Sequence, residues 1–193
     1  MTPKISIVIP FYFGMKDWQF FLIACLESIE KQTFKDYEIV IVKYSTMPVT
    51  SNRAMECAKG EIVKVLYMDD WLESEDYLEK LYEAFDNETE WVITSASTNK
   101  NPQWTDDIHT GNNKLGSPSA LAYRNYAVEE KFNENLSWVL DCDLYKRLEQ
   151  EYGKPKILTD ISVGIGVGDH QMTHKLSAEK KLEEVNYLKE KYG

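Results

Sequence analysis

The sequence predicts an α/β fold, a single domain built on a mostly parallel sheet with helices on both faces. Short apolar runs rich in β-branched residues alternate with stretches of helical periodicity over residues 5–95. The chain of 193 residues is long enough to bury one sizeable core. Its 43% hydrophobic and 12% aromatic residues are typical of a folded globular protein.

The first half of the chain carries the clearest pattern. Strands are expected at 5–10, 37–42, 62–68 and 91–95, and helices at 17–32, 52–59 and 75–85. Gly60 is suited to end the second of these helices, and Ser74 is suited to cap the third. Strands that alternate with helices in this way are typical of parallel pairing.

The second half is less regular. We expect a candidate strand at 104–110, a strand or a short helix at 118–125, and helices at 141–152 and 178–192. The glycines at 164–168 predict a mobile loop, because they precede no clear strand–helix–strand unit. No repeat or linker separates the halves, so one domain over residues 1–193 is expected.

Charge and composition limit the partners. A net charge of -10 argues against binding nucleic acid or an anionic membrane, which both attract positive charge. Three widely spaced cysteines favour reduced packing residues over a disulfide or a zinc site. With no signal peptide and no apolar stretch of membrane-spanning length, we expect a cytoplasmic protein.

Asp69 and Asp70 are the residues that point most directly to chemistry. They follow the expected strand 62–68, and ligands of open α/β sheets bind beyond the carboxyl ends of the strands. Two carboxylates there offer hard oxygen ligands, which suit Mg²⁺ or Mn²⁺ carrying a phosphorylated ligand. The alternative is a plain strand-to-helix turn, although Ser74 is already placed to cap the expected next helix.

Four stretches, taken in order, resemble the family 2 inverting glycosyltransferases of the GT-A fold, which are nucleotide-diphospho-sugar transferases. They are 5–12 with 26–34, 52–61, Tyr67-Met-Asp-Asp-Trp-Leu72, and 132–136 with Leu140-Asp-Cys-Asp-Leu144. The resemblance implies a GT-A-like domain in which 1–97 is the nucleotide-sugar-binding half and 98–193 the acceptor-side half. It also implies a metal-dependent enzyme that moves a sugar to an acceptor hydroxyl with inversion.

The resemblance further implies the cofactor and the partners. The metal is Mn²⁺ or Mg²⁺, with Asp70 as ligand and Asp69 nearer the ribose and diphosphate. His170 follows the glycine-rich segment, where family members carry a histidine facing the metal and diphosphate, with a histidine of a surface loop as the alternative, and His174 is a second candidate for the same role. The donor is a nucleotide-diphosphate sugar, with a UDP-sugar as the default, and the acceptor is a glycan, a lipid or a protein.

Asp141 falls where the family carries its catalytic carboxylate. An inverting transfer needs one carboxylate to take the proton of the acceptor hydroxyl as its oxygen attacks the anomeric carbon. A helix cap is the structural alternative for Asp141. Asp143 and Glu134 are lesser candidates for the base, and spacing alone does not separate Asp141 from Asp143.

Other residues are candidates for binding. Tyr12 resembles the position that stacks on the nucleotide base, a contact open to any base. Lys43 or Tyr44 is expected to replace a missing acidic residue, and Arg53 to reach a phosphate or to remain a surface charge. Trp104 and Trp138 are candidates for stacking on an acceptor sugar, with core packing as the commoner fate of tryptophan.

The chain departs from the family pattern at three places. Val42-Lys-Tyr-Ser45 stands where aspartates usually hold the base, the segment from there to Asn52 is short, and Tyr67 occupies the first acidic position of the metal motif. These departures leave the nucleotide open and support one rival, a noncatalytic protein that binds a nucleotide sugar or a partner. A second rival, a sugar-phosphate nucleotidylyltransferase, lacks its basic glycine-rich loop after the first strand.

Overall fold

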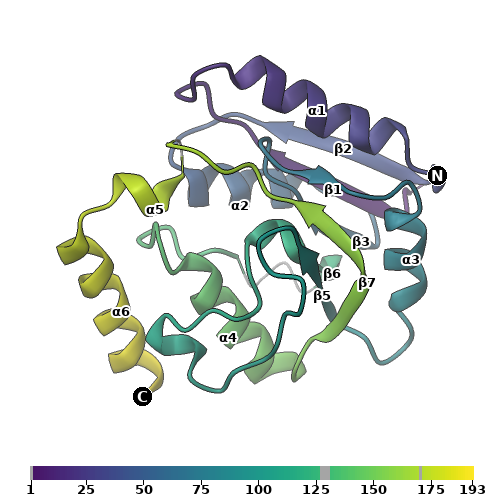
Figure 1. Cartoon of the computed structure of the whole chain (residues 1–193). Coiled ribbons are helices and arrows are strands. Elements are labelled where there is room, and N and C mark those ends of the chain that lie inside the picture. Colours follow the sequence, from purple (N-terminus) through teal and green to yellow (C-terminus); the bar gives the residue numbers. More distant parts are fainter. Residues whose placement is uncertain (1, 127–130, 170) are drawn as a thin grey trace.

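The computed structural model describes residues 2–126, 131–169 and 171–193. Its centre is a seven-stranded sheet with the order β2-β1-β3-β6-β5-β7-β4 (Figure 1). The strands are β1 (Ile5–Pro10), β2 (Tyr37–Val42), β3 (Ile62–Val65), β4 (Trp71–Leu72), β5 (Trp91–Ala96), β6 (Leu121–Arg124) and β7 (Lys156–Gly164). The helices are α1 (Trp18–Glu30), α2 (Met47–Cys57), α3 (Tyr77–Ala84), α4 (Leu140–Tyr152), α5 (Met172–Lys175) and α6 (Ala178–Tyr192), with 3₁₀ turns η1 (Ile108–Thr110) and η2 (Pro118–Ala120).

The sheet is mixed but mostly parallel. β1 pairs in parallel with β2 and β3, and β5 pairs in parallel with β7. β6 lies antiparallel between β3 and β5, so these two neighbours point the same way, and β4 is antiparallel to β7. Five of the seven described strands therefore share one direction, and the predicted fold class is confirmed.

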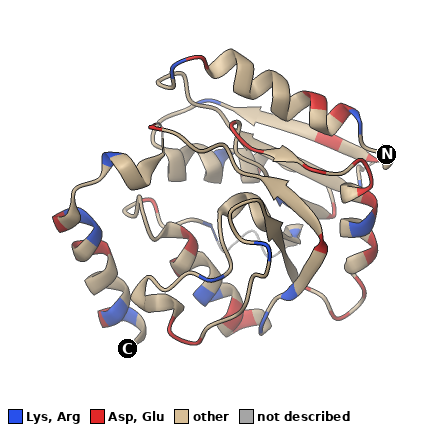
Figure 2. Ribbon diagram, in the orientation of Figure 1, with Lys and Arg blue, Asp and Glu red and all other residues tan. Residues whose placement is uncertain are grey.

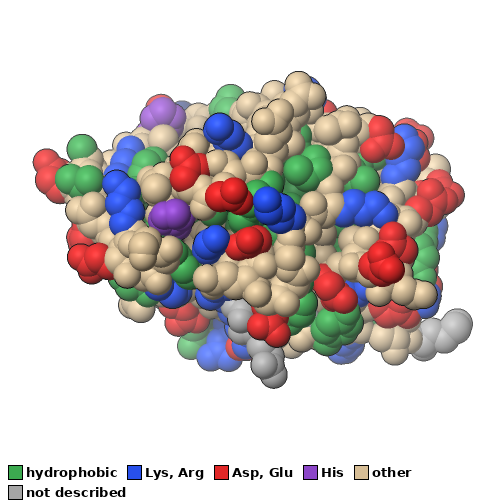
Figure 3. Space-filling model, turned by 90° about the horizontal axis from the view of Figure 1, so that it is seen from below, with side chains coloured by type: hydrophobic (Ala, Val, Ile, Leu, Met, Phe, Trp, Pro, Cys, Tyr) green, Lys and Arg blue, Asp and Glu red, His purple; other side chains and the backbone are tan. Residues whose placement is uncertain are grey.

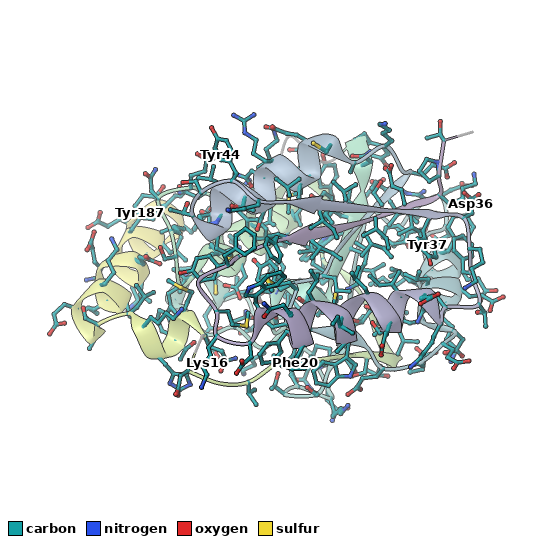
Figure 4. All side chains as sticks on the ribbon, turned by 90° about the horizontal axis from the view of Figure 1, so that it is seen from above. Lys16, Phe20, Asp36, Tyr37, Tyr44 and Tyr187 are labelled. Carbon is teal, nitrogen blue, oxygen red and sulfur yellow. The ribbon has the colours of Figure 1, made fainter. Side chains whose placement is uncertain are left out.

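Helices cover both faces of the sheet. On one face, α1 and α3 lie side by side, and the Gln32 amide beyond α1 accepts from the N–H of Leu78 at 2.9 Å and donates to the carbonyl oxygen of Ser74 at 2.7 Å. Figure 4 looks onto the β2 edge, with α1 and α2 on opposite sides of that strand. α4 shares the α2 face, where Tyr145 stacks on Trp91 of β5 with 5.9 Å between ring centroids.

Most charged side chains lie on the outside of this arrangement, and Lys64, Asp70, Asp143 and Glu184 are buried exceptions. In Figure 2 the charges follow the exposed faces of α3 and α6, while most of the central sheet carries none. On the face seen in Figure 3, basic and acidic side chains are intermixed. The three cysteines are free, with Cys25 and Cys142 buried. Within the described residues, no helix has the length and apolar character needed to cross a membrane.

The structure corrects several expected boundaries. α2 begins at Met47, five residues before the expected start at 52, because Pro48 in its first turn fixes a helical φ. β3 ends at Val65, so residues 66–70 form the turn that carries the aspartates. The candidate strand at 104–110 is wrong, since this segment contains η1, and 118–125 holds both a 3₁₀ turn and strand β6. β4, β7 and α5 were not predicted.

The strand directions decide where a site forms. The carboxyl ends of β1, β3, β5 and β7 meet at one side of the sheet, and the antiparallel strand β6 begins there. Loops from distant parts of the sequence are therefore gathered at this side, as expected for an open α/β sheet.

Candidate active site

A cleft of about 1000 Å³ opens at the carboxyl ends of the strands. This volume is at the upper end of the range for small-molecule sites. Its walls come from the turn after β1, the start of α2, the turn after β3, the segments 111–118 and 137–142, and residues 165–167 and 171–175. Both halves of the chain thus contribute to one cavity.

Asp69 and Asp70 lie in this cleft, as the sequence predicts. They form a turn in which the N–H of Asp70 donates to the carbonyl oxygen of Tyr67 at 2.9 Å. Asp70 is the inner residue, only 3% exposed, and its Oδ1 accepts from the N–H of Gly166 at 2.9 Å. Asp69 is half-buried and is the outer carboxylate. The pair therefore presents one carboxylate in the wall and one closer to solvent.

A buried lysine lies behind this pair. Lys64 of β3 is fully buried, donates from Nζ to the carbonyl oxygen of Ser119, and has its Nζ 5.1 Å from the ring centroid of Tyr77. Burial lowers the pKa of Lys64 to about 7, and the charge of Asp70 opposes that shift. Burial and the charge of Asp69 raise the pKa of Asp70 above its usual value, while Lys64 opposes the rise. The sequence analysis missed Lys64, although a lysine inside an apolar strand was the signal.

Two glycines let the segment after β7 approach the aspartates. A Cβ on Gly166 would lie 2.2 Å from the carbonyl oxygen of Asp69, and one on Gly164 would lie 2.0 Å from the ring of Trp71. At Gly166 the neighbour is backbone, so the segment after β7 packs directly on the backbone of Asp69, whereas Gly164, the last residue of β7, faces the side chain of Trp71. The predicted loop thus begins at the end of β7 and lies against Asp69.

Asp141 faces the same cleft from the first turn of α4. Its Oδ2 accepts from Nδ2 of Asn113 at 2.7 Å and its Oδ1 from the N–H of Cys142 at 2.8 Å. Burial raises the pKa of Asp141 to about 6, and the two hydrogen bonds limit the rise. A carboxylate with this pKa is ionised at neutral pH yet more basic than an exposed aspartate, as a general base requires.

The two lesser candidates for the base lie elsewhere. Asp143 is fully buried on another side of α4 and is paired with Arg147 at 3.0 Å, Lys191 at 2.8 Å and the Tyr192 hydroxyl at 2.8 Å. Glu134 accepts from Nδ2 of Asn52 at 3.1 Å. Neither residue lines the cleft, so the geometry favours Asp141 over both.

The rim contains one predicted and one unpredicted residue. Tyr12 is 54% exposed and lines the cleft, as expected for a residue that stacks on a base. Nζ of Lys175 on α5 lies 5.4 Å from the centroid of its ring. Among the described residues that line the cleft, Lys175 is the only lysine or arginine. The sequence analysis overlooked it because nothing predicted the short helix α5.

Lys43 and Arg53 do not reach the cleft. Lys43 places Nζ 4.0 Å from the ring centroid of Phe13, beyond the end of β2. Arg53 pairs with Glu56 at 2.9 Å on the exposed side of α2 and lies 5.4 Å from the ring of Tyr44, which Figure 4 shows beside α2.

The remaining candidates divide clearly. His170 lies outside the described residues, and His174 is exposed on α5 and does not line the cleft. Trp138 lines the cleft on the Asp141 side, whereas Trp104 packs edge-on against Trp91 with 6.2 Å between ring centroids. The acceptor-stacking prediction therefore retains only Trp138.

Tyr67 fills the place of the expected acidic residue. It is half-buried between the cleft and α2, and its hydroxyl lies 3.0 Å from Sδ of Met47. Burial raises the pKa of Tyr67 well above its usual value, so this side chain stays neutral. Two carboxylates therefore remain at this end of the cleft. Among the described residues, no group of three or more histidine, cysteine, aspartate or glutamate side chains is arranged to hold a metal ion.

The sheet order, the flanking helices and the position of the cleft define an α/β protein of the GT-A type. Comparison with known proteins agrees. No family model matches the sequence. The chain is 27% identical over 119 residues to EpsH of Bacillus subtilis, a protein assigned as a glycosyltransferase, and the match covers 48% of this chain and 33% of EpsH.

Solved structures show the same fold. The S. aureus protein TarS (residues 1–349) in complex with UDP-GlcNAc superposes with a TM-score of 0.70 at 17% identity, over 96% of this chain and 65% of that one. The mannosyltransferase PcManGT of Pyrobaculum calidifontis, in complex with GDP-Man and Mn²⁺, gives a TM-score of 0.61 at 15% identity, over 88% and 59% of the chains. The predicted resemblance to GT-A glycosyltransferases is confirmed, and the chain spans under two thirds of each of these proteins.

Proposed function

We propose that this chain is a glycosyltransferase domain that moves a sugar from a nucleotide-diphosphate sugar to an acceptor hydroxyl. The observation that carries the proposal is the cleft itself. Asp69 and Asp70 after β3 and Asp141 at the start of α4, 71 positions after Asp70, line the same cavity. Similarity to EpsH, TarS and PcManGT supports the same reaction class.

The donor would lie with its diphosphate at Asp69 and Asp70 and its nucleoside toward Tyr12 and the start of α2. Mn²⁺ or Mg²⁺ suits this place, since such ions bind through one or two carboxylates and complete their shell with phosphate oxygens and water. The ion would supply charge that stabilises the leaving diphosphate. Lys175 adds positive charge to the lining of the cleft.

Asp141 would act on the acceptor. Burial raises the pKa of Asp141 to about 6 and the hydrogen bond from Asn113 favours the ionised form, so the carboxylate is charged at neutral pH and able to accept a proton. The acceptor hydroxyl gives its proton to Asp141 as its oxygen forms the bond to the anomeric carbon and the bond to the diphosphate oxygen breaks. A single displacement of this kind inverts the anomeric centre. Trp138 beside Asp141 offers an apolar face for the acceptor.

The nucleotide is proposed from the neighbours alone. TarS is seen with UDP and UDP-GlcNAc, and PcManGT with GDP-Man. No acidic side chain follows β2 to select a base, since Val42 is followed by Lys43, Tyr44 and Ser45. A UDP-sugar is therefore the first donor to test, with a GDP-sugar second.

Calorimetry with a panel of nucleotide sugars, with and without Mn²⁺, tests the proposal. We expect donor binding that requires the metal and is lost in Asp69→Ala and Asp70→Ala, while Asp141→Asn binds donor but transfers at a rate lowered by about 10²–10⁴-fold. Asp106→Asn, at an exposed aspartate outside the cleft, is the matched control. Metal-independent binding, or binding without any turnover, would favour the noncatalytic alternative instead.

A further inference from the structure

Glu184 of α6 is a buried carboxylate that no part of the proposed reaction uses. Its residue is 2% exposed, and the carboxylate binds only backbone N–H groups in the interactions that the structure gives. Its Oε2 accepts from Trp138 at 2.8 Å, Ser137 at 3.1 Å and Val139 at 3.3 Å, and its Oε1 lies 3.1 Å from the N–H of Ser137. A charged acceptor with three amide donors is a strong, directional anchor.

These three N–H groups immediately precede α4. Val139 is the N-cap residue of α4, and its apolar side chain provides no cap. The first N–H groups of a helix have no partner within it and need an acceptor from outside. Glu184, from another element, accepts from the N–H of the N-cap residue Val139 and from the two N–H groups before it, and its negative charge suits the positive end of the α4 dipole. Asp141 lies two residues beyond Val139.

α6 supports the rest of this wall as well. Nζ of Lys181 lies 5.4 Å from the ring centroid of Trp138, and the Tyr187 hydroxyl, labelled in Figure 4, accepts from Nδ2 of Asn133 at 3.2 Å. Val185 packs near Gly111, where an added Cβ would lie 3.1 Å from Cγ2 of Val185. Gly111 is two residues before Asn113, the partner of Asp141. Both segments that orient Asp141 therefore rest on one helix, which Figure 1 shows along the α4 side of the molecule.

We propose that Glu184 is a positioning residue for the general base, and that α6 sets the geometry of the acceptor wall of the cleft. The proposal rests on the proposed function, in which Asp141 takes the proton. Glu184 itself does not line the cleft and would therefore not contact the donor or the acceptor. Its loss would release residues 137–139 and shift Asp141, while the Asp69–Asp70 end keeps its structure.

The chain offers a matched control at the other end of α6. Lys191 pairs with Asp143 at 2.8 Å, but Asp143 keeps Arg147 and Tyr192 as partners when Lys191 is removed. Lys191→Met therefore weakens the docking of α6 without touching the N–H groups of residues 137–139. Glu184→Gln retains one acceptor oxygen at that place, whereas Glu184→Ala removes both.

Two measurements test the proposal on the whole chain. Amide hydrogen exchange followed by NMR measures the protection of the N–H groups of residues 137–139 that bind Glu184, and it does not depend on enzyme activity. We expect Glu184→Ala to lower the protection of the Trp138 and Val139 amides at least about tenfold, Glu184→Gln to lower it less, and Lys191→Met to leave it unchanged.

Transfer kinetics with Mn²⁺ and donor then measure the effect of the altered contact on the rate of the reaction. A displacement of about 1 Å at a reacting group costs about 100-fold in rate, so kcat should fall by about that factor in Glu184→Ala. Glu184→Gln should recover much of the loss, and the donor Kd should stay within about twofold of wild type in both.

The outcomes separate this inference from the proposed function. If wild type binds no donor or transfers no sugar, the proposed function fails. The exchange result still shows whether Glu184 holds residues 137–139 in place. If Glu184→Ala does not fold, Glu184→Gln provides the same comparison. Unchanged exchange at residues 137–139 in the folded Glu184 variants would overturn the proposal. An equal loss of kcat in Lys191→Met would overturn it too, since docking of α6 would then explain the effect.

Discussion

The buried Lys64 makes a specific prediction about stability and pH. In the folded protein, burial lowers the pKa of this lysine from 10.5 to about 7. The unfolded chain keeps its proton to far higher pH. Between these values the folded state binds fewer protons than the unfolded state, so the free energy of unfolding rises with pH. Lys64→Met, which keeps a similar volume but cannot titrate, removes this contribution.

The size of the effect follows from the two pKa values. Integrating the proton linkage from pH 7 to pH 8.5 gives wild type a gain of about 2 kcal/mol from Lys64 alone. The variant lacks this gain. Loss of the Lys64 ammonium also raises the pKa of Asp70 further in the variant. Because a raised carboxyl pKa makes the free energy of unfolding fall as pH rises, this second effect widens the difference between wild type and Lys64→Met.

Guanidinium unfolding of both proteins at pH 7.0 and 8.5, in the presence of a chelator, is the assay. The cysteine thiols begin to titrate in the unfolded chain over the same pH range. Their contribution to the pH dependence is the same in both proteins and is removed by comparing the two. We expect the wild-type gain to exceed that of Lys64→Met by about 2 kcal/mol. Equal pH dependence in the two proteins would refute the reasoning that Lys64 is buried as an easily deprotonated lysine.

Three further predictions concern the cleft. Gly166→Ala should abolish metal-dependent donor binding in calorimetry, because its Cβ would lie 2.2 Å from the carbonyl oxygen of Asp69; unchanged affinity would refute this close packing. The rate of transfer should fall below about pH 6 in a pH–rate profile, since Asp141 acts only when ionised and burial sets its pKa there; a flat profile would contradict its role. Asn113→Ala should lower the rate at neutral pH and move this acid limb to higher pH, because the amide favours the ionised carboxylate. An unmoved limb would mean that Asn113 does not act on Asp141.

Local patterns predicted much of the sheet and its helices. Apolar runs such as Ile5–Pro10 and Tyr37–Val42 are strands, and the amphipathic stretch Ala178–Tyr192 is a helix, because these features depend on neighbouring residues. β7 was missed because its pattern is interrupted by Thr159 and Asp160, and its pairing with β5 shifts register after Thr94. The position of β6 between β3 and β5 depends on pairing with strands distant in the sequence, so no local pattern indicates it.

The residues of the candidate site also fall into those that a sequence pattern indicates and those that only the tertiary structure brings together. Asp69 and Asp70 were recognised because two carboxylates at the end of a strand form a local signal, and Asp141 because the family resemblance placed it. The roles of Asn113 and Glu184 could not be predicted from the sequence, because their partners are far away along the chain. Asn113 is 28 positions from Asp141, and Glu184 is 45 positions from Val139. The direction of Arg53 could not be predicted, since the packing of α2 decides which of its faces is exposed, and Arg53 lies on the exposed one.

The most direct test of the central claim uses Mn²⁺ as a paramagnetic probe. Titration of the isotope-labelled protein with Mn²⁺ and UDP, with GDP as a second arm, broadens the amide resonances nearest the ion. We predict broadening first at residues 68–70 and 166–167, with nucleotide-induced shifts at Tyr12, Thr46 and Lys175, and loss of both in Asp69→Ala. Broadening that is absent with both nucleotides, or that centres on another surface, would contradict a nucleotide-sugar site in this cleft.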